Sequence, residues 1–312
     1  MSELDKYISQ IYRSTQDVNI EHYREWALKE LQNLIHFDAA IWSTGHLSTR
    51  TFHTHTTLNL PTNFPDTLLE NLSINPISKS LFNNVGEPID MADVISDDLF
   101  YESDIYKFVF KPNKIERILS SIDIAPRSGI YTLLSIYRND RSKKFDTGEK
   151  QVYQKALFHL KEAASHACMI SLKDKDDANI AHYAICDKHG VYHEVEPMFI
   201  DMLHDCLPNI ETQSLPPELL VENERKILGE QMIQSRRLGD LFRVSIRQVK
   251  PIDILTPREQ DVVRGVTQGM SFKQIAKRMD RSPSTVSNHL YRIYQKLNIN
   301  NRSELADLIK QG

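Results

Sequence analysis

The 312-residue sequence contains no apolar run that approaches the roughly twenty residues needed to cross a bilayer. Its first residues, Met1 to Lys6, also lack the charged and then apolar order of a signal peptide. Three cysteines, Cys168, Cys186 and Cys206, form an odd and unpatterned set, which argues against a disulfide scaffold and fits a reducing compartment. We therefore expect a soluble cytoplasmic protein that does not contact a membrane.

The sequence also lacks the motifs of several reaction classes. It has no Gly-x-x-x-x-Gly-Lys loop for nucleotide phosphates, no nucleophile elbow and no metalloprotease helix. Thr44-Gly45-His46 follows the first predicted strand, where a phosphate-accepting receiver domain needs acidic residues. We expect no enzyme activity, no catalytic residue and no cofactor, because an N-terminal enzyme would need convergent catalytic groups and none is visible.

A cluster of histidines and cysteines lies between residues 182 and 206. Two of them, on one strand and four residues apart, would merely share a face of that strand. The spacings match no compact pattern of metal ligands, so no metal site is expected. The cluster consists of His182, Cys186, His189, His193, His204 and Cys206.

Charge is distributed unevenly along the chain. Residues 251–312 hold 10 Lys or Arg and 6 Asp or Glu, a net charge of +4, whereas residues 1–250 hold 28 and 36, a net charge of −8. A basic C-terminal segment attracts a phosphate backbone, and an acidic remainder is repelled by it. The length suits two or three domains, and a hydrophobic content of 40% is enough for ordinary buried cores.

The first part of the chain alternates helical and strand patterns. Residues 61–112 hold several prolines, short helical patches and an aromatic cluster, and they predict irregular covering structure. The order of helix, hairpin, insert, hairpin and helix predicts an α+β domain with an antiparallel sheet over residues 1–175, and it resembles a GAF domain, a sensory module of regulators. The elements are a helix over 19–35, strands over 39–44, 51–58, 114–124 and 129–137, and a helix over 146–172.

A charged segment, Lys173 to Asp177, predicts a domain boundary. Residues 176–250 then predict a smaller α+β domain that resembles a truncated PAS fold. Its expected elements are strands over 180–186 and 191–194, a helix over 197–207, and a last hairpin of 227–235 with 241–249.

Four aromatic residues of the first domain are candidates for the wall of a ligand cavity. Trp42 and Phe52 lie on the first predicted hairpin, and Tyr131 and Tyr137 lie on the second. The same residues are also compatible with an ordinary hydrophobic core, which is the more frequent role of such aromatic side chains.

The last sixty residues predict a series of short capped helices. Thr256, Pro257 and Glu259 match an N-cap, a first helical position and a capping-box partner, and Gly269 predicts the end of that helix. Ser271 starts a second helix, in which Ala276 is small enough for a close helix crossing.

A third helix begins at Ser282 after only two intervening residues, which predicts a sharp angle between the second and third helices. Val286, Leu290, Ile293 and Leu297 form one apolar face of this third helix. After it, Asn298 can adopt the left-handed conformation that ends a helix, and Asn301 with Glu304 caps a fourth. Residues 251–312 therefore predict an all-α four-helix domain with a helix-turn-helix over 271–290.

This segment resembles the LuxR/FixJ-type DNA-binding domain of bacterial transcription regulators. The resemblance covers about 60 of the 312 residues and uses more than a dozen positions in register. Asn298 departs from the usual glycine, and Ser287 stands at a position that is often basic in the family. With only two tryptophans in the chain, the Trp-rich pocket of the acyl-homoserine-lactone receptors finds no match. The matching motifs are Leu255-Thr256-x-Arg258-Glu259, Gly269-x-Ser271, Ile275-Ala276, Ser282-x-x-Thr285-Val286-x-x-His289-Leu290, Ile293-Tyr294-x-Lys296-Leu297 and Asn301-Arg302-x-Glu304-Leu305.

The outer face of the third helix carries the candidate contacts to DNA. Short hydrogen-bonding side chains can read base edges in a major groove, and nearby cations can bind phosphates or hold the helices together by ion pairs. His289 lies toward the other helices, which favours packing over base contact. The expected base contacts are Ser284, Ser287, Asn288 and Tyr291, and the expected phosphate contacts are Lys273, Arg281, Arg292, Lys296 and Arg302.

The sequence thus predicts a DNA-binding transcription regulator whose N-terminal region senses a ligand or a partner. The resemblance implies that it binds double-stranded DNA as a homodimer on an operator with approximate twofold symmetry, and that RNA polymerase is a further partner. In the alternative, the helical domain docks polymerase or another protein without reading bases.

Overall fold

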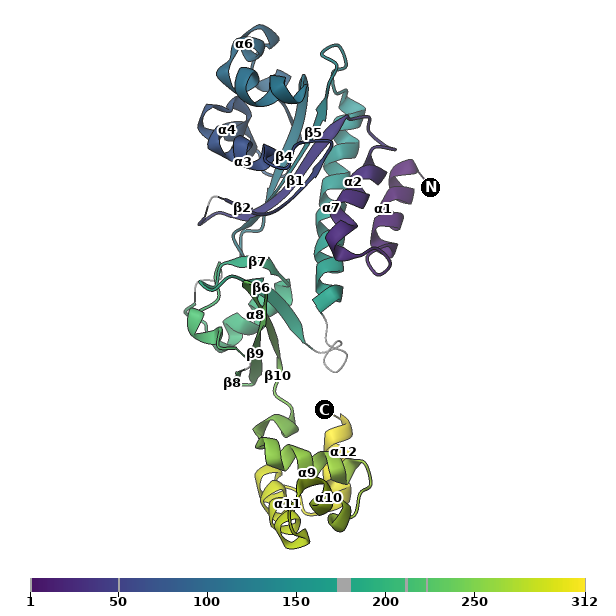
Figure 1. Ribbon diagram of the computed structural model, residues 1–312, viewed down its shortest axis with the longest axis vertical. Coiled ribbons are helices and arrows are strands. Elements are labelled where there is room, and N and C mark those ends of the chain that lie inside the picture. The colour runs from purple at the N-terminus through teal and green to yellow at the C-terminus, as the bar shows by residue number, and fades with distance from the viewer. Residues whose placement is uncertain (1, 50, 173–180, 211–212, 223, 312) are drawn as a thin grey trace. The chain divides into compact units, whose positions relative to one another are not determined.

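The computed structural model describes residues 2–49, 51–172, 181–210, 213–222 and 224–311. The chain separates into two compact units, one of Met1–Glu224 with Gln234–Ile246 and one of Arg225–Ile233 with Arg247–Gly312. The described residues hold two antiparallel sheets, each with helices, and a C-terminal group of helices (Figure 1). The ranges 1–175, 176–250 and 251–312 stay predictions of domains, and the charged segment 173–177 lies outside the described residues.

The first sheet confirms the two predicted hairpins and joins them. Its strand order is β2-β1-β5-β4-β3. The first strand of one hairpin pairs with the second strand of the other, because β1 lies antiparallel to β5 with Trp42 opposite Leu134. The strands are β1 (Ala39–His46), β2 (Thr51–Leu58), β3 (Ile89–Asp90), β4 (Arg117–Ile124) and β5 (Ile130–Arg138).

Helices cover both faces of this sheet, so the central strands are apolar on both sides (Figure 1). Successive side chains of a strand point to opposite faces. Trp42 and Leu134 therefore pack in one hydrophobic cluster, with α1, α2 and α7, while Ile41 and Leu133 pack in the other, with α3 to α6. The helices of the first cluster are α1 (Glu3–Arg13), α2 (Ile20–Leu31) and α7 (Thr147–Leu172).

The sequence analysis did not predict α1. Its N-terminus is closed by a capping box, in which the Ser2 hydroxyl accepts the Asp5 amide at 3.1 Å and the Asp5 carboxylate accepts the Ser2 amide at 2.9 Å. Tyr7 and Ile11 bury one side of the helix in the first cluster.

Residues 61–112 cover the sheet and contain the predicted short helical patches, so only the description of this segment as irregular was wrong. The segment covers the sheet with short helices, because Pro65 and Pro76 stand in first turns, where proline starts a helix rather than breaking it. Its elements are α3 (Phe64–Glu70), α4 (Pro76–Asn83), α5 (Met91–Val94), α6 (Asp97–Glu102), a π-helical turn Tyr106–Phe110 and 3-10 turns Leu72–Ile74 and Lys111–Asn113.

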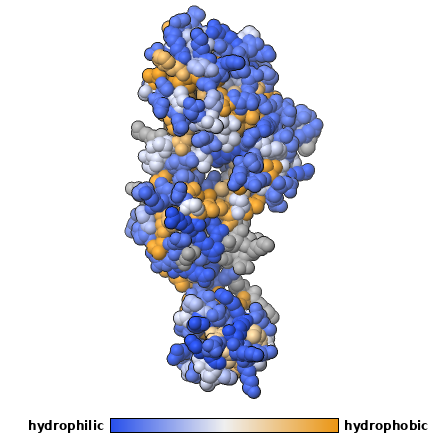
Figure 2. Space-filling view, in the orientation of Figure 1, coloured by the Kyte–Doolittle hydropathy of each residue, from blue (hydrophilic) through white to orange (hydrophobic). Residues whose placement is uncertain are grey.

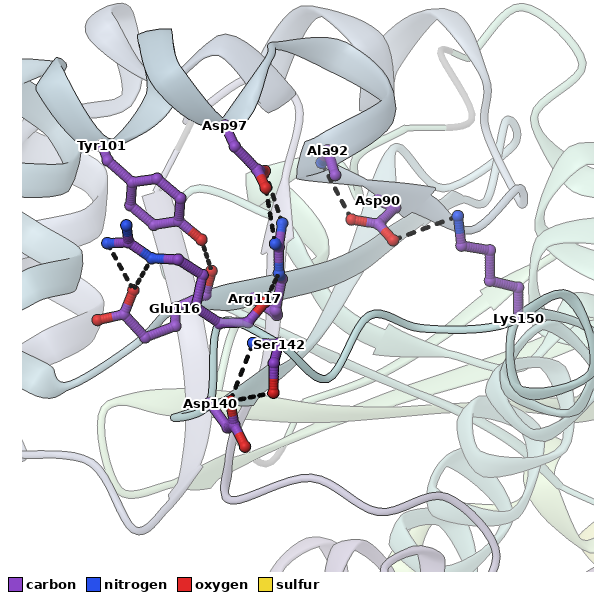
Figure 3. A network of polar contacts seen from close by, with 10 residues as sticks. Asp90, Ala92, Asp97, Tyr101, Glu116, Arg117, Asp140, Ser142 and Lys150 are labelled. Carbon is purple, nitrogen blue, oxygen red and sulfur yellow. Dashed lines mark hydrogen bonds and ion pairs between the residues drawn. The ribbon is translucent and has the colours of Figure 1, made fainter.

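Polar contacts fasten α6 to the sheet (Figure 3). Arg117 of β4 is only 4% exposed and donates to both carboxylate oxygens of Asp97, at 2.6 and 2.7 Å. The Tyr101 hydroxyl donates to the carbonyl oxygen of Glu116 at 3.0 Å. Because a buried guanidinium is costly without its carboxylate, this pair fixes the position of the helical layer.

The second sheet has the order β7-β6-β10-β9-β8, which repeats the order of the first sheet when its strands are counted along the chain. The predicted hairpin of 227–235 with 241–249 is present as β9 and β10, but the start of its first strand was wrong. Two strands lie in that stretch, separated at Gly229, whose φ of 58° suits glycine. The elements are β6 (His182–Cys186), β7 (Tyr192–Val195), α8 (Pro197–Cys206), a 3-10 turn Pro217–Leu219, β8 (Arg225–Leu228), β9 (Gln231–Leu238) and β10 (Leu241–Gln248).

The C-terminal helices pack around their own core of Leu255, Val262, Val263, Ile275 and Leu290 with their neighbours. A 3-10 turn, Pro251–Ile254, precedes them. The helices are α9 (Pro257–Thr267), α10 (Phe272–Met279), α11 (Pro283–Leu297) and α12 (Arg302–Gln311).

Candidate nucleic-acid interface

The N-terminus of α9 is closed by the predicted capping box. The Thr256 hydroxyl accepts a hydrogen bond from the backbone amide of Glu259 at 3.4 Å, and the Glu259 carboxylate accepts one from the Thr256 amide at 2.8 Å. The helix is followed by Gly269 in the left-handed conformation, with a φ of 77°. The start and the end of α9 are therefore encoded locally.

A tight turn sets the angle between α10 and α11. Ser271 and Gln274 cap α10, and Asp280 then takes the left-handed conformation, with φ 52° and ψ 52°. Aspartate tolerates this conformation better than most residues do. The Ser282 hydroxyl accepts the Thr285 amide at 3.2 Å and so starts α11 after only two intervening residues. The predicted helix-turn-helix is confirmed in these elements.

The helices α9 and α10 approach each other closely at Gly265, which the sequence analysis missed. A Cβ atom built there would lie 2.7 Å from Cγ1 of Ile275. Ala276 is also buried in this core, at 2% exposure. A glycine inside a helical pattern was the available signal for this contact.

The two faces of α11 are sharply different. Val286, Leu290 and Ile293 are buried, and Leu297 is partly buried against the same core. The four predicted base-contacting residues are all exposed on the other side of α11, and Tyr291 has 65% of its surface exposed. The visible surface of the C-terminal helices is mostly hydrophilic (Figure 2). These four residues are Ser284, Ser287, Asn288 and Tyr291.

Two hydrogen bonds hold hydroxyl groups on this face. The Ser284 and Ser282 hydroxyl oxygens lie 2.7 Å apart, and the Tyr291 hydroxyl accepts from Nε2 of Gln295 at 3.0 Å. Asn288 forms no hydrogen bond through its side chain within the described residues. Its amide is free to donate and to accept together, as paired contacts to an adenine edge require.

The five predicted phosphate-contacting residues fall into two groups. Lys273, Arg281 and Arg292 are exposed and form no ion pair in the part of the chain that the structure describes. Lys296 and Arg302 have partners inside the domain: Nζ of Lys296 donates to Glu259 at 2.7 Å, and Nη2 of Arg302 donates to the carbonyl oxygens of Val266 and Met270.

The ion pair between Lys296 and Glu259 joins α11 to the start of α9. Burial alone would raise the pKa of Glu259, but the hydrogen bonds from Lys296 and Thr256 outweigh burial and hold that pKa below its usual range. Sequence reasoning identified Glu259 as a capping residue and Lys296 as a phosphate contact. It could not see that the two meet, because they lie 37 positions apart.

The four aromatic residues predicted to line a ligand cavity lie on two faces of the first sheet. Phe52, Tyr131 and Tyr137 line a narrow apolar cavity of about 60 Å³ beneath α3 and α4. Trp42 lines a different cavity, on the side of α2 and α7. The strand alternation that separates them is visible in the sequence, but the sequence analysis did not use it.

No group of three or more potential metal-ligating side chains lies together among the described residues. In the same part of the chain, no helix combines the length and the apolar character that a membrane span requires.

Comparison with protein families finds one match, over residues 253–309, to the model described as "Bacterial regulatory proteins, luxR family". A curated HTH-type transcriptional regulator of Mycobacterium tuberculosis is 53% identical over 53 residues, which are 17% of this chain and 6% of that protein. The transcriptional regulatory protein DegU of Brevibacillus brevis is 34% identical over 94 residues, which are 30% of this chain and 39% of DegU. The nitrate/nitrite response regulator NarL of Escherichia coli is 29% identical over 104 residues, which are 32% of this chain and 48% of NarL.

The chain thus spans less than half the length of these curated relatives, all of which are described as regulators. Among solved structures, SdiA of Escherichia coli is similar over 97% of this chain and 95% of SdiA, with 13% identity and a TM-score of 0.41. That score is too low to establish a shared fold. What the comparisons establish concerns the C-terminal segment: residues 253–309, which contain the helix-turn-helix of α10 and α11, are similar to the luxR family of bacterial regulatory proteins.

Proposed function

We propose that the chain is a sequence-specific DNA-binding transcription regulator that acts in the bacterial cytoplasm. The observation that carries this proposal is the outer face of α11, which is exposed, rich in hydroxyl and amide groups, and free of acidic residues. A helix of this kind, held by a tight turn, fits a DNA major groove.

In this proposal Ser284, Ser287, Asn288 and Tyr291 contact bases. Lys273, Arg281 and Arg292 contact phosphates, since each is exposed and without an ion pair among the described residues. Lys296 and Arg302 mainly brace the domain, although the ammonium group of Lys296 lies on a side chain that is 41% exposed and can still approach a phosphate.

Selection of a preferred duplex from a random pool, followed by gel-shift titration of variants, tests the assignment. Asn288→Ala should relax the preference at one base position, by about 1–3 kcal/mol of discrimination. Lys273→Ala should weaken binding to all sequences and flatten its salt dependence. Arg264→Ala serves as a control, because it removes a charge of the same domain that lies outside the proposed set. If Asn288→Ala and Lys273→Ala both bind as the unaltered chain does, the interface is misplaced.

We further propose that the two sheets are GAF-like and PAS-like sensory modules. Their common strand order supports this, because it indicates two versions of one α+β topology. The apolar cavity of the first sheet is a candidate ligand site. It adjoins a hollow of about 440 Å³ that shares Leu72, Phe82 and Tyr131 with it.

The chemistry of this cavity favours a mostly apolar small molecule with one hydrogen-bond donor. Leucine, isoleucine and aromatic side chains form most of the wall, and the Ser120 and Ser135 hydroxyl groups bond to each other at 2.7 Å. Oδ1 of Asn75 is buried there without a partner, and an unsatisfied buried acceptor costs about 1–3 kcal/mol. A donor on the ligand would remove that cost.

Mass spectrometry of small molecules extracted from the purified chain tests the ligand site. We expect an apolar compound that co-purifies with the unaltered chain and is depleted in a Leu133→Phe variant, whose larger side chain narrows the cavity. Recovery of no such compound, or equal recovery from both preparations, would contradict the assignment.

The regulator is proposed to act as a homodimer, with RNA polymerase as a further partner. In the competing account the C-terminal helices dock a protein and do not contact DNA. Salt-dependent binding to random-sequence duplex DNA separates the two accounts, because only a DNA-binding domain shows it.

A further inference from the structure

A second cavity, of about 230 Å³, lies on the face of the first sheet opposite the apolar cavity. Apolar atoms form the larger part of its wall, but five charged side chains also line it. Its wall is built by α2, α7, the strands β1, β4 and β5, and the strand β7 of the second sheet, all within one compact unit. This volume is larger than that of several water molecules, each of which occupies about 30 Å³ in the liquid. It is smaller than the volume of most pockets that bind drug-sized molecules.

Three of the five charged residues around this cavity form ion pairs among themselves. Nζ of Lys161 donates to Oδ2 of Asp123 at 2.6 Å and lies 3.3 Å from Oε1 of Glu162. Arg24 and Glu194 remain. Within the described residues neither forms an ion pair, with the other or with any other side chain.

Arg24 is held in place by neutral groups. Its guanidinium donates to the hydroxyl oxygens of Thr54 and Thr44, at 3.0 and 3.1 Å, and its Cζ lies 5.2 Å from the centre of the Trp42 ring. These contacts leave further guanidinium N–H groups for a ligand. Burial lowers the pKa of Arg24, against the opposing effect of the nearby Glu194.

Glu194 is the matching anion. Its Oε1 accepts from the Ser165 hydroxyl at 2.8 Å, and no side chain of the described residues donates to its other carboxylate oxygen. Burial raises the pKa of Glu194, against the opposing effects of Ser165 and Arg24. Ionised Glu194 would therefore be stabilised by a cationic group placed in the cavity.

We propose that this cavity binds a small zwitterion of the free amino acid class, with its carboxylate on Arg24 and its ammonium group on Glu194. Two opposite charges that line one cavity without meeting are complementary to a ligand that carries both charges. The guanidinium binds a carboxylate through two parallel hydrogen bonds. The site is distinct from the apolar cavity and does not depend on the DNA-binding role of the C-terminal helices.

Isothermal titration calorimetry on the full chain tests the proposal, with the twenty common free amino acids as probes. At least one of them should bind, and its N-acetyl and carboxamide derivatives should each bind at least about tenfold more weakly, because each derivative lacks one charge. Binding of none of the twenty, or equal binding of a derivative, would overturn the zwitterion assignment.

Two charge-removing variants locate the site. Arg24→Gln and Glu194→Gln should each weaken binding at least about tenfold, while Arg13→Gln and Glu21→Gln, exposed residues of α1 and α2, should leave it unchanged. Should Arg24→Gln fail to fold, Glu194→Gln alone decides the outcome. Unchanged binding in a folded Glu194→Gln variant would place the amino acid elsewhere and contradict the proposal.

Discussion

Glu259 performs two tasks in the C-terminal helices. It caps α9 through Thr256, and it pairs with Lys296 on α11, with a side chain that is only 5% exposed. The glutamate therefore couples the start of the first helix to the helix that carries the candidate DNA-contacting face. A glutamine keeps the capping oxygen and removes the charge, so it separates the two tasks.

We predict that Glu259→Gln lowers the free energy of unfolding of the C-terminal helices by about 1–2 kcal/mol, because a charged hydrogen bond is lost. Hydrogen exchange of α9 and α11 amides measures this change. Arg258 is an exposed neighbour of Glu259, and the control variant Arg258→Gln should change the free energy of unfolding by less than about 0.5 kcal/mol. The pKa of Glu259 in the folded chain lies below its ordinary value of 4.5. The difference in unfolding free energy between the unaltered chain and Glu259→Gln should therefore be complete above pH 4.5, and it should shrink as the pH falls through the pKa of the folded chain. Equal protection of Glu259→Gln and the unaltered chain would contradict the account.

His53 should make the N-terminal unit sensitive to acid. Burial and the neighbouring His193 and His46 lower its pKa from 6.5 to about 4, and the His53 and His193 rings stack at 4.1 Å. Between these pH values the unfolded chain binds a proton that the folded chain does not bind. Stability should therefore be lost as the pH falls from 6.5 toward 4.

Melting temperatures across that range test this prediction. His53→Gln should reduce the fall of the melting temperature between pH 6.5 and 4. It should not abolish this fall, because the pKa of His193 is lowered as well. His55→Gln, at an exposed position of the same strand, should follow the unaltered chain. Parallel pH curves for His53→Gln and the unaltered chain would rule out the proposed role of His53.

Periodicity predicted correctly which side chains of α11 are buried and which are exposed, since both depend only on helix geometry. The partners of Lys296 and Arg302 could not be predicted. Glu259 and the carbonyl oxygens of Val266 and Met270 come close to them only after the helices have packed.

At the scale of elements, the contact between α9 and α10 depends on a missing side chain. Gly265 allows Ile275 to approach the α9 backbone. In most helix interiors a change from glycine to alanine stabilises by about 0.5–1 kcal/mol. Here we predict the opposite sign for Gly265→Ala, a loss of about 1–3 kcal/mol, because the new methyl group would overfill the core.

Hydrogen exchange of the α9 and α10 amides measures that loss. A double variant, Gly265→Ala with Ile275→Val, should recover part of it, because valine lacks the terminal methyl of isoleucine. Increased protection in Gly265→Ala would show that the helices can separate without cost and would contradict the packing described above.

Local signals explain which elements could be predicted. The hairpins of the first sheet and the long α7 have strong patterns of apolar residues, and all were predicted. Between residues 61 and 112 the sequence predicted only short helical patches without exact bounds, because helices of so few turns hardly show a period. They form because the sheet gives them an apolar surface. The break at Gly229 was missed because its flanking residues continue a strand pattern on both sides. The N-terminal α1 had a clear capping signal that was overlooked.

At the scale of the whole molecule, charge separates the segments by their proposed roles. Residues 251–312 carry +4 and the remainder carries −8. An acidic sensory region does not compete for the phosphate backbone, so binding to DNA should be confined to the C-terminal helices.

We predict that the full chain is a homodimer in solution. Light scattering coupled to size-exclusion chromatography should give twice the mass of one chain, and the selected operator should contain two inverted half-sites about one helical turn apart. A monomer at every concentration, together with a single unrepeated half-site, would contradict the dimeric account.

The salt dependence of DNA binding tests the central claim, that the exposed side of α11 and its flanking cations form the DNA-contacting surface. Fluorescence anisotropy with a labelled random-sequence duplex measures it for the unaltered chain and for a triple variant of Lys273→Gln, Arg281→Gln and Arg292→Gln. The logarithm of the binding constant should fall linearly with the logarithm of salt concentration, and the slope should be shallower by about three in the triple variant. An unchanged slope, or no binding to duplex DNA even at low salt, would contradict the claim.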